Sequence, residues 1–328
     1  MKFNLEFYKG EDLYSDGNIE SEILDYTEEY YESEFDKIFE NDIRWPIFYH
    51  LTDIRKNIIN WYPMKKNCSV LEIGAGMGAI TSVLCQKAKK VTCVELSKQR
   101  ATAIANRNKN QENLEIIVGN LNDVKFDEKF DYITLIGVLE YAPLYTNSKN
   151  PFVDFLSYIK QFLKPDGIIL IAIENKLGMK YFAGAPEDHT NIKYDGIMGY
   201  SNKESVQTFG KKEMQELLKS VGLKNTKFYY PLPDYKLPNI VFSDEYLPDE
   251  NTINNYNIYY YEGTQIEFDE KKAYAETIKN GVFDIFSNSF FVEASAKKIK
   301  TKVDLKNADF VKISENAKRF YDKDYTKK

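Results

Sequence analysis

Short apolar runs alternate with amphipathic stretches from Ser69 onward, and this rhythm is typical of strands and helices that follow one another in a parallel sheet. Five apolar runs predict strands, at 70–73, 91–95, 114–118, 132–136 and 168–173. Amphipathic stretches between them predict helices at 79–87, 98–108 and 152–163, and the proline and glycine in 164–167 predict a turn. Strands and helices in this order predict a doubly wound α/β sheet.

The regions on either side of this pattern differ from it. Apolar residues at helical spacing predict helices near 19–39 and 46–61, the second ending before Pro63. Beyond Glu174 the pattern predicts a helix at 211–221 and strands at 227–230 and 289–294. We therefore divide the chain into four segments. They are an N-terminal helical region on the side of a bound substrate (1–66), a core (67–230), an inserted tyrosine-rich segment that contacts or covers the substrate (231–281), and the last core strand with a basic tail (282–328).

Composition favours a cytoplasmic protein without an integral membrane segment. The 328 residues are 43% hydrophobic, and the longest apolar run, near 168–173, is too short to cross a bilayer. The start of the chain is polar, and three cysteines without a CxxC pair fit a reducing compartment. From Lys297 onward eleven lysines and arginines face five acids, but the basic residues lack the dense clustering that a nucleic-acid surface needs, so we expect no nucleic-acid partner.

A glycine-rich segment follows the first predicted strand and precedes a helix. It reads Val-Leu-Glu-Ile-Gly-Ala-Gly-Met-Gly-Ala over 70–79, with glycine at 74, 76 and 78. Glycines at these places let the backbone approach a ligand that a Cβ would repel. Because Gly74, Gly76 and Ala79 also satisfy the dinucleotide pattern, the glycines alone do not distinguish S-adenosyl-L-methionine from NAD.

Two acidic residues narrow the choice of cofactor. Glu72 precedes Gly74 by two positions, where its carboxylate can face the cationic amino and sulfonium groups of S-adenosyl-L-methionine but would repel a pyrophosphate. Glu95, at the end of the next strand, can accept bonds from both ribose hydroxyls of either cofactor. We therefore predict S-adenosyl-L-methionine as the cofactor, held in part by Glu72, Gly74, Ala75, Gly76, Gly78, Glu95 and Leu96.

The ordered motifs LEIGAGMGAIT, VTCVEL, GNLNDV, FDYITLIGVLEY and LKPDGIILIAIEN, over about 68–175, resemble those of class I S-adenosylmethionine-dependent methyltransferases. The resemblance implies a Rossmann-like sheet of seven strands in the order 3-2-1-4-5-7-6, with the final strand antiparallel and a large insertion before it. It also implies that Asn120 and Leu121 approach the adenine, although the family more often has Asp at the first of these positions. Gly137 matches the strand end that lines the methionine part.

A narrower resemblance covers the flanks. The stretches LYSDGNIESEIL, ENKLGMKYFAGAPEDHT and YPLPDYKLPNIVFSDEYLP, at 13–24, 174–190 and 230–248, are similar to methyltransferases of bacterial surface-polysaccharide clusters. This similarity implies that the acceptor is a hydroxyl of a saccharide or glycan precursor. It transfers no catalytic residue to this chain.

A hydroxyl is a poor nucleophile, so the acceptor chemistry needs a base. The chain has two histidines, of which His50 fits a structural role on a helix. His189 follows the fifth strand in Ala-Pro-Glu-Asp-His-Thr, where doubly wound sheets place their ligands, and Glu187 or Asp188 could orient it. We predict that His189 is the catalytic base. We predict no metal, and metal assistance through Glu140, Glu174, Asn175 and Asp188 is the alternative.

Three questions stay open at this stage. The acceptor could be an amine or carboxyl group of a peptide or natural product instead of a hydroxyl, or the chain could be a non-catalytic S-adenosylmethionine-binding interaction module. The tyrosines at 235, 246 and 259–261 fit either a lid over a sugar or the packing of a small added layer. The sequence does not give the oligomeric state.

Overall fold

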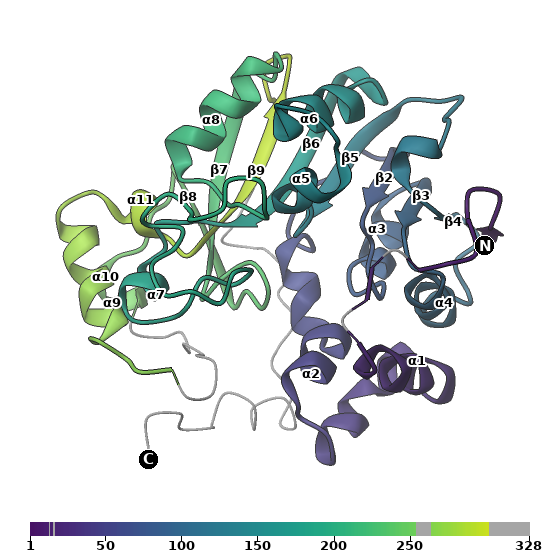
Figure 1. Ribbon diagram of the computed structural model, residues 1–328, viewed down its shortest axis with the longest axis horizontal. Helices are drawn as coiled ribbons and strands as arrows, with labels where there is room; N and C mark the ends of the chain where they lie inside the picture. The colour runs from purple at the N-terminus through teal and green to yellow at the C-terminus, as the bar shows by residue number, and fades with distance from the viewer. Residues whose placement is uncertain (13, 16, 254–263, 302–328) are drawn as a thin grey trace. The chain divides into compact units, whose positions relative to one another are not determined.

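The computed structural model describes all residues except 13, 16, 254–263 and 302–328 (Figure 1). The chain forms two compact units. The described part of unit 1 comprises residues 1–135, 162–167 and 301, and that of unit 2 comprises residues 136–161 and 168–300. Across the described ranges, no helix has both the length and the apolar character needed to cross a membrane.

Unit 1 is built on parallel strands. Their order is β1-β4-β3-β2-β5, and each neighbouring pair is parallel. The strands are β1 (Lys2–Asn4), β2 (Ser69–Ile73), β3 (Lys90–Glu95), β4 (Leu114–Val118) and β5 (Phe130–Ile136). The four strands predicted at 70–136 are thus confirmed within two residues, whereas β1 was not predicted because three residues give no usable period.

Some helices of unit 1 come before β2 in the chain, and others follow β2, β3 and β4. They are α1 (Ile19–Glu29), α2 (Trp45–Leu51), α3 (Thr81–Lys87) and α4 (Lys98–Arg107), with 3-10 helices η1 (Glu32–Glu40), η2 (Asp53–Ile58) and η3 (Leu121–Asp123). The single helix predicted at 46–61 is wrong. Thr52 is extended and its Oγ1 accepts a hydrogen bond from the Ile54 N–H, so it starts η2 after α2 has ended.

Unit 2 contains the antiparallel part of the fold. Its strand order is β6-β9-β7-β8, and every neighbouring pair is antiparallel. The strands are β6 (Leu163–Glu174, in unit 2 from Ile168), β7 (Asn225–Leu232), β8 (Ile240–Ser243) and β9 (Ser289–Ser295). The antiparallel final strand is therefore confirmed, and β9 lies between β6 and β7 as the resemblance implies.

The mixed α/β sheet fits the predicted Rossmann-like class, but its strand count is larger than the predicted seven. The described residues contain nine strands, because β1 and β8 add to the predicted set. The turn predicted at 164–167 is also wrong, since these residues lie inside β6. Pro165 and Asp166 are exposed near the start of that strand, where a proline without an N–H is tolerated.

Helices of unit 2 are mostly short. They are η4 (Leu139–Tyr141), α5 (Ala142–Tyr145), α6 (Pro151–Lys160), α7 (Met179–Phe182), α8 (Lys211–Ser220), α9 (Glu250–Ile253), α10 (Glu270–Lys279) and α11 (Phe283–Phe286). The segment 231–281 carries β8, α9 and α10, so it has structure of its own, as its length predicts. Tyr235 is buried and Tyr246 is exposed. The predicted lid tyrosines 259–261 lie outside the described residues. The four-segment division of the chain stays a prediction.

Candidate functional site

The predicted cofactor residues of unit 1 gather around the loop that leaves β2. Gly74, Gly76 and Gly78 all have positive φ, of 67°, 56° and 76°. Gly76 has open space where a Cβ would be, whereas a Cβ on Gly78 would lie 3.1 Å from the Cα of Ile104. One glycine thus keeps space free beside the loop, and another lets the loop pack against α4.

Glu95 ends β3 and is buried beside this loop. Its Oε2 accepts a hydrogen bond of 2.7 Å from the Gly76 N–H, and its Oε1 accepts one of 3.1 Å from the Ser97 N–H. Burial raises its pKa, while Arg100 and the backbone donors act in the opposite direction. The carboxylate therefore holds the loop in shape, and its role toward the ribose hydroxyls stays a prediction.

Glu72 lies inside β2 and is also buried. Its Oε2 accepts a 2.8 Å hydrogen bond from Thr81 Oγ1, at the first residue of α3. Burial raises its pKa to about 8, and the nearby charge of Glu95 adds to the rise. A cation beside this carboxylate would favour its ionised form, which is the role predicted for Glu72.

The remaining predicted cofactor residues are divided between the units. Asn120 ends the turn after β4, and its Oδ1 accepts from the Asn122 N–H at 3.0 Å, while Leu121 is buried. Both lie in unit 1. Gly137 lies in unit 2, where its N–H donates to the Ala172 carbonyl at 2.9 Å. A Cβ on Gly137 would lie 2.9 Å from the hydroxyl of Tyr235.

Sequence patterns did not reveal the residues that fix the shape of this site. Arg107, on α4, donates to the Met77 carbonyl inside the glycine loop and to the His50 carbonyl, at 3.1 and 2.8 Å. Asp12 accepts from the N–H groups of Lys98 and Gln99 at the start of α4. These contacts join segments far apart in sequence, so no local spacing predicts them.

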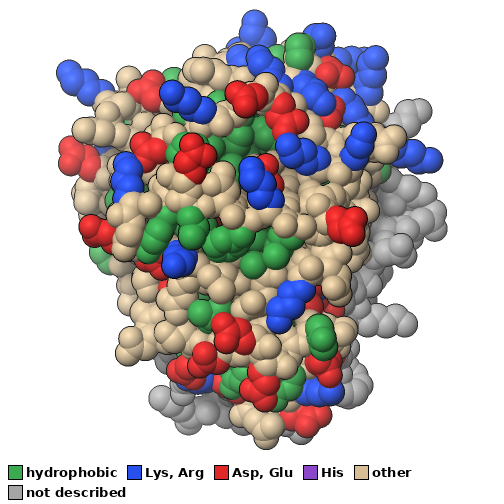
Figure 2. All heavy atoms as spheres, turned by 90° about the vertical axis from the view of Figure 1, so that its right-hand side faces the viewer, with side chains coloured by type: hydrophobic (Ala, Val, Ile, Leu, Met, Phe, Trp, Pro, Cys, Tyr) green, Lys and Arg blue, Asp and Glu red, His purple; other side chains and the backbone are tan. Residues whose placement is uncertain are grey.

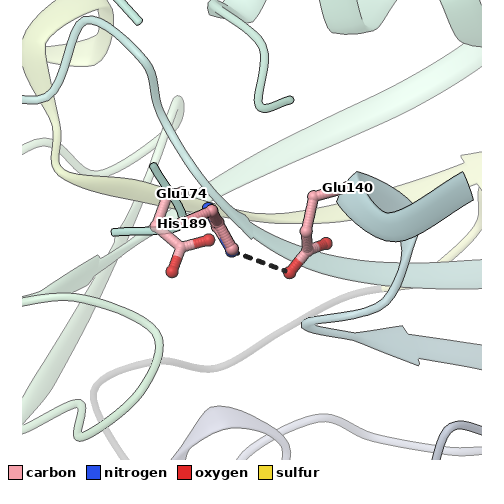
Figure 3. Close-up of side chains that lie close together, drawn as sticks. All are labelled: Glu140, Glu174 and His189. Atoms are coloured by element: carbon pink, nitrogen blue, oxygen red, sulfur yellow. Dashed lines mark ion pairs between the residues drawn. The ribbon is translucent and has the colours of Figure 1, made fainter. Parts of the chain in front are cut away.

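In unit 2, Glu140, Glu174 and His189 point toward one another (Figure 3). Glu140 lies in η4, Glu174 is the last residue of β6, and His189 lies in the loop after α7. Both glutamates are buried, and one ligand atom from each of the three residues lies within 4.8 Å of the others. His189 Nε2 is 3.9 Å from Glu140 Oε1.

Glu187 is the acid that orients His189. Its Oε1 lies 3.2 Å from His189 Nδ1, and its Oε2 accepts from the N–H groups of His189 and Thr190, both at 2.8 Å. Asp188, the other candidate, instead pairs with Lys180 and Lys236 at 2.8 and 2.6 Å. The imidazole is therefore fixed through Nδ1, with Nε2 on the side of Glu140.

The carboxylates around His189 set its protonation. Burial alone would lower its pKa, but the hydrogen bond to Glu187 and the charges of Glu174 and Glu140 outweigh burial and raise the pKa to about 9. Burial, and then Glu174, raise the pKa of Glu140. In the protein without a ligand, His189 is thus mostly protonated at neutral pH. A bound ligand must lower the pKa of His189 before Nε2 can accept a proton.

Asn175 does not join this cluster, although it was an alternative ligand. Its amide donates to the carbonyls of Ile285 and Ser287, and its Oδ1 accepts from the Leu177 N–H. Its side chain therefore ties the end of β6 to the segment before β9. The metal-ligand alternative thus retains two of its four proposed residues in the cluster, Glu140 and Glu174.

Comparisons with known proteins find a methyltransferase domain in the part of the chain that contains the glycine loop. Residues 71–171 match the family model described as a methyltransferase domain. The chain is 33% identical over 72 residues to ribosomal RNA small subunit methyltransferase A of Fusobacterium nucleatum, covering 22% of this chain and 27% of that protein. It is 32% identical over 135 residues to an uncharacterized methyltransferase of Staphylococcus carnosus, covering 41% and 56%. The matches thus span about a quarter to just over half of these relatives.

Among solved structures, the complex between the Haloferax volcanii Trm112 methyltransferase activator and the putative methyltransferase aligns with a TM-score of 0.46 at 14% identity. It covers 82% of this chain and 96% of that one. The match of 71–171 contains the glycine loop, Glu72 and Glu95. Residues 71–171 thus match a methyltransferase domain, and S-adenosyl-L-methionine is its cofactor, as predicted.

Proposed function

We propose that the chain transfers the methyl group of S-adenosyl-L-methionine to a hydroxyl of a small polar acceptor, most specifically a saccharide or glycan precursor. The observation that carries the proposal is a partly buried histidine beside buried carboxylates in unit 2, fixed through Nδ1 by Glu187. Transfer to an existing oxyanion or a free amine needs no such group, whereas a hydroxyl must lose a proton.

In the proposed reaction the acceptor oxygen attacks the sulfonium methyl carbon. The carbon–sulfur bond breaks, the carbon–oxygen bond forms, and S-adenosylhomocysteine leaves. The hydroxyl proton passes to His189 Nε2, since Nδ1 faces Glu187. Binding energy and alignment supply the rest, because in-line transfer chiefly requires that donor and acceptor are held in register and that water is excluded.

The saccharide part of the proposal rests on the flanking stretches at 13–24, 174–190 and 230–248, which are similar to methyltransferases of surface-polysaccharide clusters. Two of these stretches supply neighbours of Glu140 in unit 2, because Glu174 and His189 belong to the second, and Lys236, which pairs with Glu174, to the third. A cytoplasmic location, where activated sugar precursors are made, fits this acceptor.

A ribosomal RNA acceptor is the second candidate, because the relative from Fusobacterium nucleatum carries that name. Its match covers only 22% of this chain and 27% of that protein. On the face drawn in Figure 2, lysines and arginines are interspersed with aspartates and glutamates. Because this relative matches so small a share of the chain, the small acceptor is the better supported proposal.

Two measurements test the proposal. Calorimetric titration compares S-adenosylhomocysteine with NAD, and binding of NAD alone would overturn the cofactor assignment. Transfer of label from methyl-labelled S-adenosyl-L-methionine is then followed with three acceptor panels: nucleotide sugars and oligosaccharides, small amines and peptides, and ribosomal RNA. Label on a sugar oxygen supports the proposal. Label only on amines, or only on RNA, would replace it with the corresponding alternative.

A further inference from the structure

Glu140 is a buried carboxylate without a hydrogen-bond donor. Its exposed fraction is 1%, and neither Oε1 nor Oε2 has a hydrogen-bond partner among the described residues. Glu174 is fully buried, and its two oxygens likewise lack hydrogen bonds. The ammonium of Lys236 lies 2.6 Å from Glu174 Oε1, an ion pair that leaves Oε2 free of donors. Buried carboxylates normally have donors or a metal ion, so Glu140 indicates a missing partner, beside a Glu174 that is paired with Lys236.

The three side chains have the spacing of metal ligands. Atoms bound to one ion at about 2.0 to 2.2 Å lie at most about 4.4 Å apart. The ligand atoms of Glu140, Glu174 and His189 lie within 4.8 Å of one another, and the Nε2 to Oε1 distance is 3.9 Å (Figure 3). Because 4.4 Å applies only to ligands on opposite sides of an ion and neighbouring octahedral ligands lie about 3 Å apart, the side chains would have to close by roughly 1 Å to surround one cation.

The support for the imidazole is also that of a metal ligand. Glu187 faces Nδ1 of His189 and is itself held by the N–H groups of His189 and Thr190. The ring of Tyr141 packs edge-on against the imidazole, with centroids 5.4 Å apart. Metal-binding histidines commonly donate their second ring N–H to a carboxylate, which fixes the tautomer and makes the other nitrogen a better ligand.

Acidic side chains outnumber lysines in the ion pairs around the cluster. Five carboxylates are linked by ion pairs to two lysines and to His189: Glu140, Glu174, Glu187, Asp188 and Asp234. Lys180 pairs with Asp188 and Asp234, and Lys236 with Glu174 and Asp188. A divalent cation bound to Glu140 and Glu174 would add positive charge beside two buried carboxylates.

We propose that Glu140, Glu174 and His189 bind one divalent cation of the Mn²⁺ type. Carboxylate oxygens suit Mg²⁺ and Mn²⁺, and the imidazole favours the transition metal of the two. The inference rests on the proposed function, because an open coordination position would take the acceptor hydroxyl. There the hydroxyl loses its proton to water and its oxygen then receives the methyl group, with cleavage of the carbon–sulfur bond. His189 is then a ligand and not the base.

Metal binding is measured directly on the full chain after treatment with EDTA and dialysis. Titration with MnCl₂, followed by the paramagnetic resonance signal of free Mn²⁺, should give one bound ion per chain and a raised unfolding temperature. Mg²⁺ should bind at least about tenfold more weakly, because the imidazole favours Mn²⁺. Absence of stoichiometric Mn²⁺ binding would overturn the inference, and equal affinity for Mg²⁺ would remove His189 from the ligand set.

Three variants and a control locate the ion. Glu140→Gln and His189→Asn should each weaken Mn²⁺ binding more than about 100-fold, and Glu187→Gln by about 10- to 100-fold, the range for a residue that supports a ligand. Glu216→Gln changes an exposed acid on α8 and should bind Mn²⁺ as the parent chain does. Undiminished binding by Glu140→Gln would place the ion elsewhere and contradict the proposal.

Folding and cofactor binding are checked in the same samples. Glu140→Gln removes a buried charge, so in EDTA its unfolding temperature should equal or exceed that of the parent chain. If it does not fold, His189→Asn decides the question. S-adenosylhomocysteine binding without Mn²⁺ binding retires the metal inference and leaves the methyltransferase proposal intact. Mn²⁺ binding without S-adenosylhomocysteine binding retires the methyltransferase proposal and leaves the metal site intact. Methyl transfer that survives EDTA excludes a catalytic role for the ion.

Discussion

Glu72 and Glu95 beside the cofactor loop have different surroundings from Glu140 beside His189. In unit 1, the oxygens of Glu95 accept backbone hydrogen bonds, and Glu72 accepts one from Thr81. In unit 2, Glu140 has no hydrogen-bond donor among the described residues, and its neighbour His189 lies 3.9 Å away. The cofactor loop is thus held in shape by the protein itself, whereas Glu140 has no such hydrogen bonds, which is the observation behind the proposed cation.

The largest expected effect belongs to unit 2. His189→Ala should lower turnover on the hydroxyl acceptor by about 10² to 10⁴, the range for loss of a group that assists proton removal. Affinity for S-adenosylhomocysteine should change by less than about threefold, because Glu72, Glu95 and the glycine loop lie in unit 1. Steady-state kinetics and calorimetry measure the two quantities separately. Turnover within about threefold of the parent chain would exclude His189 from catalysis.

The second-largest effect should be a loss of affinity for the cofactor. Glu95→Ala removes the acceptor for the Gly76 and Ser97 N–H groups and for the ribose hydroxyls. We expect S-adenosylhomocysteine binding to weaken by about 1.5 to 3 kcal/mol, the value for hydrogen bonds to a charged group. Glu293→Gln is a suitable comparison, since Glu293 is also a buried acid that accepts a hydrogen bond, from Tyr229 in unit 2. Equal losses in both variants would indicate general destabilisation.

The two sites also differ in how far the sequence predicts them. Glu72, the three glycines and Glu95 lie at the ends of two neighbouring strands, so local spacing was sufficient to predict the cofactor and its loop. The unit 2 cluster combines η4, the end of β6, the loop after α7 and Lys236 beyond β7. Position after a strand drew attention to His189, but no spacing predicts that Glu140 lies beside it.

The same contrast explains the errors in the predicted fold. Long apolar runs predicted the central strands, whereas β1 and β8 have only three and four residues and give too short a pattern. The turn predicted at 164–167 failed because proline and glycine also occur at the start of a strand such as β6. Asn175 was considered as a metal ligand from its position, but its contacts are with backbone carbonyls.

Two glycines in the loop should respond differently to alanine. Both have positive φ, so each substitution should lower the free energy of unfolding by about 1 to 2 kcal/mol. Gly78→Ala should lose more, since its Cβ would meet the Ile104 backbone, whereas Gly76→Ala has open space and should chiefly weaken cofactor binding. Chemical denaturation and calorimetry separate these outcomes. A larger stability loss for Gly76→Ala would contradict the assignment of free space to the cofactor.

The smallest expected effect is a pH dependence of cofactor binding through Glu72. Its pKa in the free protein is raised to about 8, first by burial and then by Glu95, while Thr81 and Arg107 act in the opposite direction. A bound cofactor with cationic groups favours the carboxylate, so binding releases a proton below pH 8. Affinity for S-adenosyl-L-methionine should therefore rise between pH 7 and 8.5 by roughly fivefold to tenfold, and should level off above that range.

Glu72→Gln is the control for this pH dependence, because the amide keeps the shape and the hydrogen bond to Thr81 Oγ1 without titrating. The variant should bind more weakly and with an affinity that is nearly constant between pH 7 and 8.5. Calorimetry in two buffers of different ionisation enthalpy gives the number of protons released, which should fall from nearly one in the parent chain at pH 7 to nearly none in the variant. The same pH profile in both chains would mean that another group titrates, and that Glu72 does not face the cationic part of the cofactor.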